Sequence, residues 1–333
     1  MKNALFLLVS LSLVAASAGA ASLLEQNAES AVLKRLREEL KIDDATRALR
    51  IEKLEVKALG EKRELVTASF EAGPAGRFRL LLQGPKDFLK STAPRAVLFI
   101  SAGFYSGTRH LELLSGDEDQ ILIGFEYSDD TKGLIERPEQ FARTVVQVPA
   151  RLMLSLRWAQ RQPWADPSRF HIMGISLGTL YLPVTLRMLQ AEGFDFTSYI
   201  SAFGGVGIRH PLYEVLRLSF GANESRLLTE LISAVTTPYE PMWYLPQLTG
   251  RKLIIHGGRD AVFRDSSRKD LDRLAGGPKM TCTLIGGVHI DLWKEKEVNA
   301  TVKILRAWLK SETGPFSFPQ IEDKGVDCVT STL

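Results

Sequence analysis

The amino-acid sequence predicts an α/β fold, with a mostly parallel, twisted sheet that carries helices on both faces. Two observations predict it. From residue 95 onward, short apolar segments alternate with longer segments of helical periodicity, as parallel strands joined by helical crossovers do. One apolar segment, residues 169–175, runs directly into a glycine-bounded turn and then a helix-like stretch, which makes a strand–turn–helix unit. The chain of 333 residues is long enough for one large domain of this class.

The N-terminus has the pattern of a secretory signal peptide over residues 1–20. A lysine precedes the apolar run Ala4–Ala16, and small residues suited to signal-peptidase cleavage follow it. The run is short for a membrane span and no cysteine directly follows it, although an uncleaved anchor is the alternative. We therefore expect a secreted or periplasmic protein. Because no later run of about eighteen apolar residues occurs, we expect no integral membrane segment in the mature chain.

The mature chain is expected to begin with a helix and two antiparallel strands. Apolar side chains recur at helical spacing over 23–41, so residues 22–47 are predicted to form an N-terminal helical segment. Residues 48–59 and 64–83 alternate or cluster apolar side chains around a Gly-Pro-Ala-Gly turn at 73–76. This pattern is typical of antiparallel strands.

The segments that follow supply the parallel part of the sheet. The predicted elements are strands at 95–102, 120–127, 169–175 and 197–203, and helices at 137–161 and 177–192. In such sheets, ligands bind outside the carboxyl ends of the strands. We therefore expect the residues that carry chemistry at those ends.

Ser176 lies in the strand–turn–helix unit, between Gly174 and Gly178 in a Gly-x-Ser-x-Gly pattern. A serine hydroxyl is a weak nucleophile, so a hydrolase must present it beside a base and beside backbone N–H donors. The two glycines allow neighbouring backbone to approach the turn closely. A serine between glycines is otherwise an ordinary turn residue, so the interpretation as a nucleophile depends on partners elsewhere in the chain.

Candidate partners follow in two segments of similar layout. In each, a short apolar run leads to a Gly-Gly pair, and then to Asp260 in the first segment and His289 in the second. Of the five histidines, only His289 follows Asp260, so the order serine, acid, histidine selects a single base. Asp265 in the same loop is the alternative acid. Plain turn or loop roles for Asp260 and His289 are the alternative to both assignments.

These residues and their order resemble the α/β-hydrolase superfamily of serine hydrolases over roughly residues 48–312. The resemblance implies a mostly parallel sheet of about eight strands, within a catalytic domain at 48–314. It also implies that Ser176 is the nucleophile and His289 the general base and then acid. Asp260 would then be the carboxylate that fixes the imidazole tautomer.

The oxyanion loop departs from the family's usual pattern. The family often has His-Gly-Gly after the third strand, whereas the strand beginning at Arg95 runs here into Ser101-Ala102-Gly103-Phe104. Gly103 still permits close backbone approach. We expect the backbone N–H of Gly103 or of Phe104 to join that of Leu177 in binding an oxyanion, and the choice between the two stays open.

Residues 206–250 interrupt the alternation at a position usual for a cap or lid insertion in the family that the chain resembles. Helical stretches at 212–220 and 225–235 precede an aromatic, proline-rich segment at 236–246. Aromatic side chains above the site would form a substrate pocket. Ordinary helix packing is the alternative.

The two cysteines are Cys282, in the last predicted strand, and Cys328, in the C-terminal tail at 315–333. An oxidising compartment would let them form a disulfide that holds a tail with little apolar content of its own. Two unpaired thiols are the alternative. Two cysteines at this separation offer no familiar metal site, and we expect neither a metal nor another cofactor.

The amino-acid composition restricts the classes of molecule that the protein is expected to bind. The hydrophobic content of 45% and charged content of 24% are ordinary for a globular protein. The net charge of +3 arises from interspersed charges, without the interleaved basic and aromatic residues of nucleic-acid-binding proteins. We expect a small-molecule or acyl substrate and no nucleic-acid partner, and the sequence does not predict an oligomeric state.

Taken together, these features predict an exported serine hydrolase that cleaves an ester bond through an acyl-enzyme. Amide or peptide hydrolases and acyltransferases use the same three residues and are alternatives, because only the pocket separates them. A binding protein that keeps the fold without turnover is an alternative of a different class. The presence of all three residues in order disfavours it.

Overall fold

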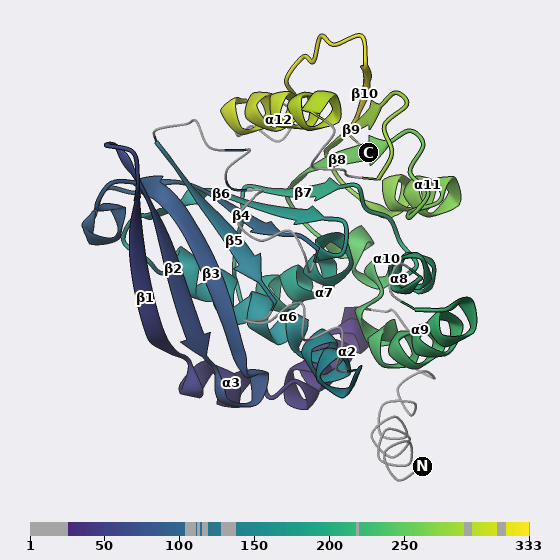
Figure 1. Cartoon of the computed structure of the whole chain (residues 1–333), viewed down its shortest axis with the longest axis horizontal. Helices are drawn as coiled ribbons and strands as arrows, with labels where there is room; N and C mark the ends of the chain where they lie inside the picture. The colour runs from purple at the N-terminus through teal and green to yellow at the C-terminus, as the bar shows by residue number, and fades with distance from the viewer. Residues whose placement is uncertain are drawn as a thin grey trace.

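The computed structural model describes residues 26–103, 111, 114, 119–127, 138–217, 220–289, 295–311 and 318–332. The predicted signal peptide at 1–20 and the oxyanion candidate Phe104 lie outside these residues, so both stay predictions. The described strands form one sheet, and helices lie on both of its faces (Figure 1). The predicted α/β class is therefore confirmed.

The sheet has ten strands in the spatial order β1-β2-β3-β5-β4-β6-β7-β8-β9-β10, rather than the about eight that the resemblance implied. In chain order they are β1 (Arg50–Leu59), β2 (Arg63–Glu71), β3 (Arg77–Pro85), β4 (Arg95–Ser101), β5 (Gln120–Glu126), β6 (Ala165–Ile175), β7 (Ser198–Ala202), β8 (Arg251–Gly257), β9 (Lys279–Leu284) and β10 (Val326–Ser331).

The strands from β5 to β9 form the parallel centre of the sheet. Every residue of β7 and β8 is buried, as expected for strands that are covered on both faces. At one edge, β1, β2 and β3 add antiparallel strands, and β2 alternates buried with half-buried residues. The predicted regions 48–59 and 64–83 thus form strands β1, β2 and most of β3, an antiparallel extension of the sheet.

The opposite edge ends in β10, which the sequence pattern does not predict. Its side chains alternate between half-buried and exposed, so it lacks the apolar run that marks a buried strand. It pairs antiparallel with β9, and Cys328 lies opposite Cys282 in the register. The C-terminal tail is therefore partly an edge strand.

Every helical segment predicted from the sequence corresponds to a described α-helix to within a few residues, with one difference in the N-terminal segment. Three further described helices, at 241–244, 265–274 and 295–310, lie outside the predicted helical segments. The described α-helices are α2 (Gln26–Glu39), α3 (Ile42–Ala48), α6 (Pro138–Gln160), α7 (Gly178–Gln190), α8 (Arg209–Leu216), α9 (Ala222–Thr236), α10 (Pro241–Tyr244), α11 (Asp265–Leu274) and α12 (Glu295–Lys310). The difference is that the single helix expected over 23–41 is followed at once by α3. Lys41 separates the two helices because it adopts a left-handed conformation with a φ of 50°, which an α-helix cannot continue through.

The helices divide between the two faces of the sheet (Figure 1). One core cluster packs α6 and α7, together with the N-terminal α2 and α3, against the sheet. The other packs α12 through Ile304 and Trp308 against the opposite face. The strands therefore lie between two apolar layers, and their carboxyl ends lead into the loops that carry the candidate residues.

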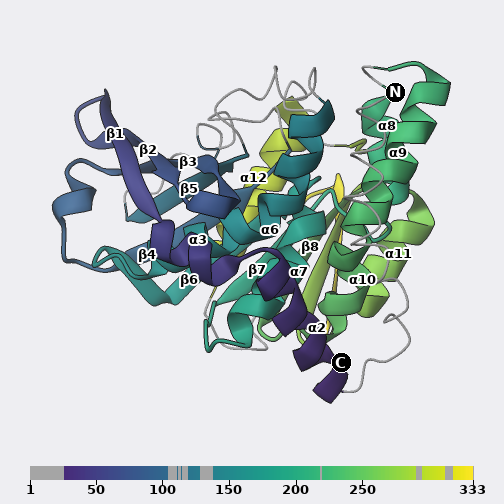
Figure 2. The same cartoon turned by 90° about the horizontal axis from the view of Figure 1, so that it is seen from below.

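Within the predicted insertion at 206–250, α8 packs against α9, while α10 contacts both α7 and α11 (Figure 2). Tyr239 and Tyr244 are buried, and their hydroxyls donate to the carbonyls of Val146 at 3.2 Å and Pro238 at 2.6 Å. These two aromatic residues pack as core, which is the alternative that the sequence left open. Among the described helices, none has both the length and the apolar character needed to cross a bilayer.

Candidate active site

Ser176 occupies a strained turn between β6 and α7. Its φ is 52°, a left-handed conformation that is costly for a residue other than glycine. Hydrogen bonds hold it there: its N–H donates to the Ala202 carbonyl at 3.0 Å, and the Thr179 hydroxyl donates to the Ser176 carbonyl at 2.6 Å. The turn projects the serine at the carboxyl end of a central strand.

Two glycines make this turn possible. A Cβ on Gly178 would lie 1.9 Å from the Ser101 carbonyl oxygen, and one on Gly174 would lie 2.9 Å from the Thr179 backbone nitrogen. Both clashes are with backbone, which cannot rotate away. The close approach that the sequence predicts for these glycines is thus present in the structure.

Asp260 follows β8, with its carboxylate held at both oxygens. Oδ1 accepts the N–H groups of Val262 at 2.8 Å and Phe263 at 3.0 Å, while Oδ2 lies 2.9 Å from Nδ1 of His289. The side chain has no exposed surface. Asp260 therefore forms a turn and also contacts the imidazole. The turn role and the role as partner of the histidine, which the sequence offered as alternatives, are compatible.

The Gly-Gly pairs bring the acid loop and the histidine loop together. A Cβ on Gly257 would lie 2.2 Å from the Val288 carbonyl oxygen, so the loop before His289 crosses directly over the end of β8. The Arg259 N–H donates to the Gly287 carbonyl at 2.6 Å. The similar layout of the two segments in the sequence thus corresponds to two loops packed against each other.

His289 connects the acid to the serine. Its Nε2 lies 2.7 Å from the Ser176 hydroxyl, and its Nδ1 faces Asp260. Because a carboxylate only accepts hydrogen bonds, Nδ1 carries the proton and neutral Nε2 accepts the bond from the serine. The Phe203 and Phe263 rings flank the imidazole, with centroids 6.4 Å and 5.9 Å away, while 22% of the His289 side chain stays exposed. The imidazole is thus oriented and still accessible.

Asp265, the alternative acid, does not take part in this cluster. It lies in the first turn of α11, is largely exposed and pairs with Lys269 at 2.7 Å. The hydrogen bond from Lys269 lowers the pKa of the Asp265 carboxyl from 3.8. In the part of the chain that the structure describes, the His289 imidazole contacts Asp260 instead.

The oxyanion donors are described only in part. Among the described residues, none accepts a hydrogen bond from the Leu177 N–H, which lies next to Ser176 at the start of α7. No described atom lies within 4 Å of the position that a Cβ on Gly103 would take. The choice between Gly103 and Phe104 as the second donor stays a prediction, since Phe104 lies outside the described residues.

Tyr127 is a residue near the site that the sequence pattern does not single out. It is buried, and its hydroxyl donates to the Ala102 carbonyl at 2.6 Å. The Ser101 hydroxyl, 3.1 Å away, must then be the donor to the Tyr127 oxygen. Burial raises the pKa of the Tyr127 hydroxyl well above 10, so it stays protonated. Its position at the carboxyl end of a predicted strand was the available signal.

The two cysteines lie outside the serine–histidine–aspartate cluster. Cys282 and Cys328 form a disulfide in the structure, between the cross-strand partners of β9 and β10. The bond joins the tail to the strand that leads into the His289 loop. Among the described residues, no cluster of histidine, cysteine, aspartate or glutamate is arranged to hold a metal ion.

Solved structures provide the comparison for this architecture. Acetyl xylan esterase 1 from Thermoanaerobacterium sp. JW/SL YS485 is 12% identical, with a TM-score of 0.55 over 81% of this chain and 92% of that chain. An acetyl xylan esterase from Paenibacillus sp. R4 is 13% identical, with a TM-score of 0.55 over 79% and 91%. The esterase from Pyrobaculum calidifontis is 15% identical, with a TM-score of 0.51 over 84% and 93%. This chain has the α/β-hydrolase fold.

At such low identity, the likeness of these α/β-hydrolase structures concerns the fold alone. No protein-family model matches the chain, and no curated protein sequence matches it significantly. The α/β-hydrolase fold places a serine turn, an acid loop and a histidine loop at neighbouring strand ends. Here those places hold Ser176, Asp260 and His289, joined by hydrogen bonds.

Proposed function

We propose that this α/β-hydrolase-fold protein is an exported serine hydrolase that cleaves a carboxylic ester through an acyl-enzyme. The observation that carries the proposal is the line of hydrogen bonds from Ser176 through His289 to Asp260, at 2.7 and 2.9 Å. These distances lie in the range over which a base activates a nucleophile and a carboxylate orients the base.

The proposed acylation begins with attack of the Ser176 Oγ on the ester carbonyl carbon. The hydroxyl proton passes to Nε2 of His289, and the carbonyl electrons move onto the oxygen to give a tetrahedral oxyanion. Collapse breaks the bond to the leaving alcohol, which takes the proton from Nε2. Water then attacks the acyl-serine by the same route, so that His289 returns to its neutral state and the carboxylic acid is released.

Asp260 would supply orientation and charge in this sequence. Its Oδ1 is fixed by two backbone N–H groups, so Oδ2 holds the tautomer in which the His289 Nε2 faces the serine. The carboxylate also stabilises the imidazolium that forms during attack. The Leu177 N–H would be one of the donors to the oxyanion.

Two further observations support an exported esterase. Several similar folds are those of proteins named as esterases, and the N-terminal 20 residues have the composition of a secretory signal. Other structures of this fold carry peptidase names, so the substrate tests need amides beside the esters.

The direct test is turnover of short acyl esters and matching aminoacyl amides by the purified protein and by Ser176→Ala. We expect ester hydrolysis that falls by about a thousandfold or more in the variant, because the three residues act as a unit. Ser168→Ala is the matched control, since this serine lies at the opposite end of β6 and bonds Asp166. Equal ester turnover by Ser176→Ala would refute the assignment, and turnover of amides alone would move the proposal to peptide-bond chemistry.

A further inference from the structure

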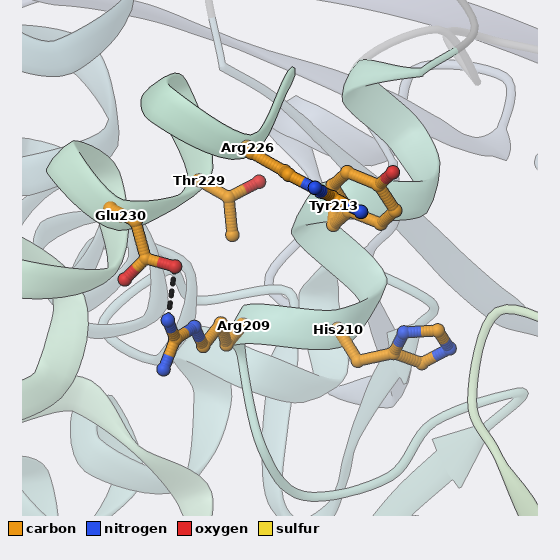
Figure 3. Close-up of a pocket in the computed structure, with 6 residues that line it drawn as sticks. All are labelled: Arg209, His210, Tyr213, Arg226, Thr229 and Glu230. Atoms are coloured by element: carbon orange, nitrogen blue, oxygen red, sulfur yellow. Dashed lines mark hydrogen bonds and ion pairs between the residues drawn. The ribbon is translucent and has the colours of Figure 1, made fainter. Parts of the chain in front are cut away.

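A second feature of the carboxyl-end region is a pocket between α8 and α9, with a volume of about 380 Å³. Figure 3 shows the side chains that line it: Arg209, His210 and Tyr213 come from α8, and Arg226, Thr229 and Glu230 from α9. The volume falls within the range of small-molecule sites. None of the six lining residues takes part in the hydrogen bonds that join Ser176, His289 and Asp260.

The pocket lies next to the acid loop. His210 Nε2 is 3.4 Å from the Ala261 carbonyl oxygen, which accepts its hydrogen bond, and Ala261 follows Asp260 in the chain. The segment that enters α8 also contacts α11, the helix that follows this loop, because the Ser267 hydroxyl donates to the Val206 carbonyl. A molecule bound in the pocket would therefore lie beside the loop that holds the candidate acid.

The charged groups of the pocket favour an anion. Two arginines line it against one glutamate, and that glutamate is paired with Arg209 (Figure 3). Among the described residues, none forms a hydrogen bond or an ion pair with the Arg226 side chain. A guanidinium without an acid partner binds carboxylate and phosphate oxygens through charge-assisted hydrogen bonds.

A buried hydroxyl in the same pocket also lacks a partner. Thr229 is only 3% exposed, and in the described structure its Oγ1 has no hydrogen-bond partner. Buried hydroxyls are normally bonded, and leaving one unbonded is unfavourable. Thr229 lines the pocket, and because its Oγ1 is covered by neighbouring atoms, a ligand oxygen completes its hydrogen bonding once a side chain of the pocket shifts.

We propose that the α8–α9 pocket binds an anionic group of the substrate, a carboxylate or a phosphate, carried at a distance from the bond that is cleaved. Arg226 binds the anion, and the Thr229 hydroxyl donates to one of its oxygens. This inference rests on the proposed function, because it assigns the substrate class of the same hydrolase.

The experiment compares esters that differ only in one remote group. In the first set, 4-nitrophenyl monoesters of four-, six-, eight- and ten-carbon diacids are matched with the corresponding alkanoates. In the second, O-acetyl ω-hydroxy acids are matched with alkyl acetates, which moves the anion to the alcohol side. Phosphate-terminated analogues of the best length then separate the two anions. We expect kcat/KM to favour the anionic ester about tenfold at one length in one set.

Four variants locate the effect. Arg226→Ala removes the anionic preference, while Arg226→Lys, which keeps the charge, restores part of it. Glu230→Gln raises the preference because it removes the one acidic side chain of the pocket. Arg161→Ala, at the exposed turn after α6, controls for the loss of an arginine and leaves the ratio unchanged. Since charge interactions at this exposed site are screened, 0.5 M salt lowers the ratio in the wild type.

Thr229→Val separates a ligand contact from a structural one. Because the described structure shows no partner for this hydroxyl, the variant keeps or raises the melting temperature while the anionic preference falls severalfold. A lower melting temperature with an unchanged preference would make the hydroxyl structural and count against the proposal.

Binding to Ser176→Ala distinguishes failure of this inference from failure of the proposed function. Calorimetry with monomethyl adipate and methyl hexanoate needs no turnover, and we expect tighter binding of the anionic ester that depends on Arg226. If neither set of esters shows an anionic preference that Arg226→Ala abolishes, while turnover persists, the pocket proposal is overturned. If turnover is absent but the Arg226-dependent binding is present, the enzymatic assignment fails and the anion site stands.

Discussion

Among the residues that the structure describes, three histidines each have a serine or aspartate partner, and of these only His289 has both. His256, in β8, bonds Asp272 at 3.0 Å, and its Nδ1 is buried without a partner among the described residues. His171, in β6, bonds the Ser198 hydroxyl at 2.8 Å. Both lie within strands, whereas His289 lies in a loop at the carboxyl end of the sheet.

The histidine–aspartate pairs also differ in which of the two side chains is buried. The side chain of His256 is 5% exposed against 22% for His289. For the carboxylates the order is reversed, since Asp272 is 33% exposed and Asp260 fully buried. A reactive imidazole needs access to substrate and a rigid, desolvated acid behind it. A histidine–aspartate contact alone is thus weak evidence for a site.

The largest effect is expected from the two acids. Asp260→Asn should lower kcat by about a thousandfold or more, because an amide can stabilise the wrong imidazole tautomer. Asp272→Asn, the matched change at the other pair, should alter kcat by no more than about twofold. Steady-state kinetics on one ester measures both. Equal losses in the two variants would remove the distinction drawn between the pairs.

The disulfide gives the next effect, on stability rather than chemistry. Replacing Cys282 and Cys328 by serine should lower the free energy of unfolding by about 3–4 kcal/mol in the chain-entropy model, with kcat retained at temperatures where the protein is folded. Urea unfolding with parallel kinetics checks this. Loss of activity in the fully folded variant would show that the tail supports the His289 loop directly.

His171 is expected to make stability depend on pH. Its burial, with the nearby positive charges of Arg251 and Arg169, lowers its pKa from 6.5 to about 4. As the pH falls below 6.5, the unfolded chain takes up a proton first, so the free energy of unfolding decreases until about pH 4, by about 3 kcal/mol in full.

Urea unfolding between pH 7 and pH 4.5 tests this dependence against His171→Gln, which does not titrate. The difference in unfolding free energy between wild type and variant should shrink as the pH falls through this window. Parallel curves would show that the imidazole is not kept neutral by the fold.

The smallest effect concerns Tyr127. Tyr127→Phe removes the bond to the Ala102 carbonyl and leaves Ser101 without its acceptor, so the segment that leads into the candidate oxyanion residue Gly103 is less firmly held. We expect kcat to fall about tenfold with little change in KM. Tyr239→Phe, which also removes a buried bond from a tyrosine to a carbonyl, is the control and should keep kcat. A similar decrease in both variants would indicate general destabilisation.

The parallel sheet and the serine–acid–histidine order were accessible from sequence, because buried strands and tight turns require particular residue types locally. Asp260 and His289 were selected as candidates by their order and by the glycines that precede them, and the structure brings both into contact with each other. Those glycines now have a physical reason, since the two loops cross with backbone contact at Gly257 and Val288.

Other features depend on how distant segments meet, which a single sequence does not encode locally. Tyr127 reaches Ala102 only because β5 and β4 are neighbours in the sheet. The residues of strand β10 are half-buried or exposed, so its own sequence does not mark it as a strand, and it forms by pairing with β9. The α8–α9 pocket is lined by residues of two helices that contact each other. The sequence pattern of either helix alone does not indicate a pocket.

Covalent labelling tests whether Ser176 is the nucleophile of an ester hydrolase. The protein is treated with a fluorophosphonate and digested, and the modified peptide is found by mass spectrometry. We expect one adduct, on Ser176, whose formation removes ester turnover in proportion to labelling and is far slower in His289→Ala. Labelling of another serine, or full esterase activity in protein fully labelled at Ser176, would contradict this assignment.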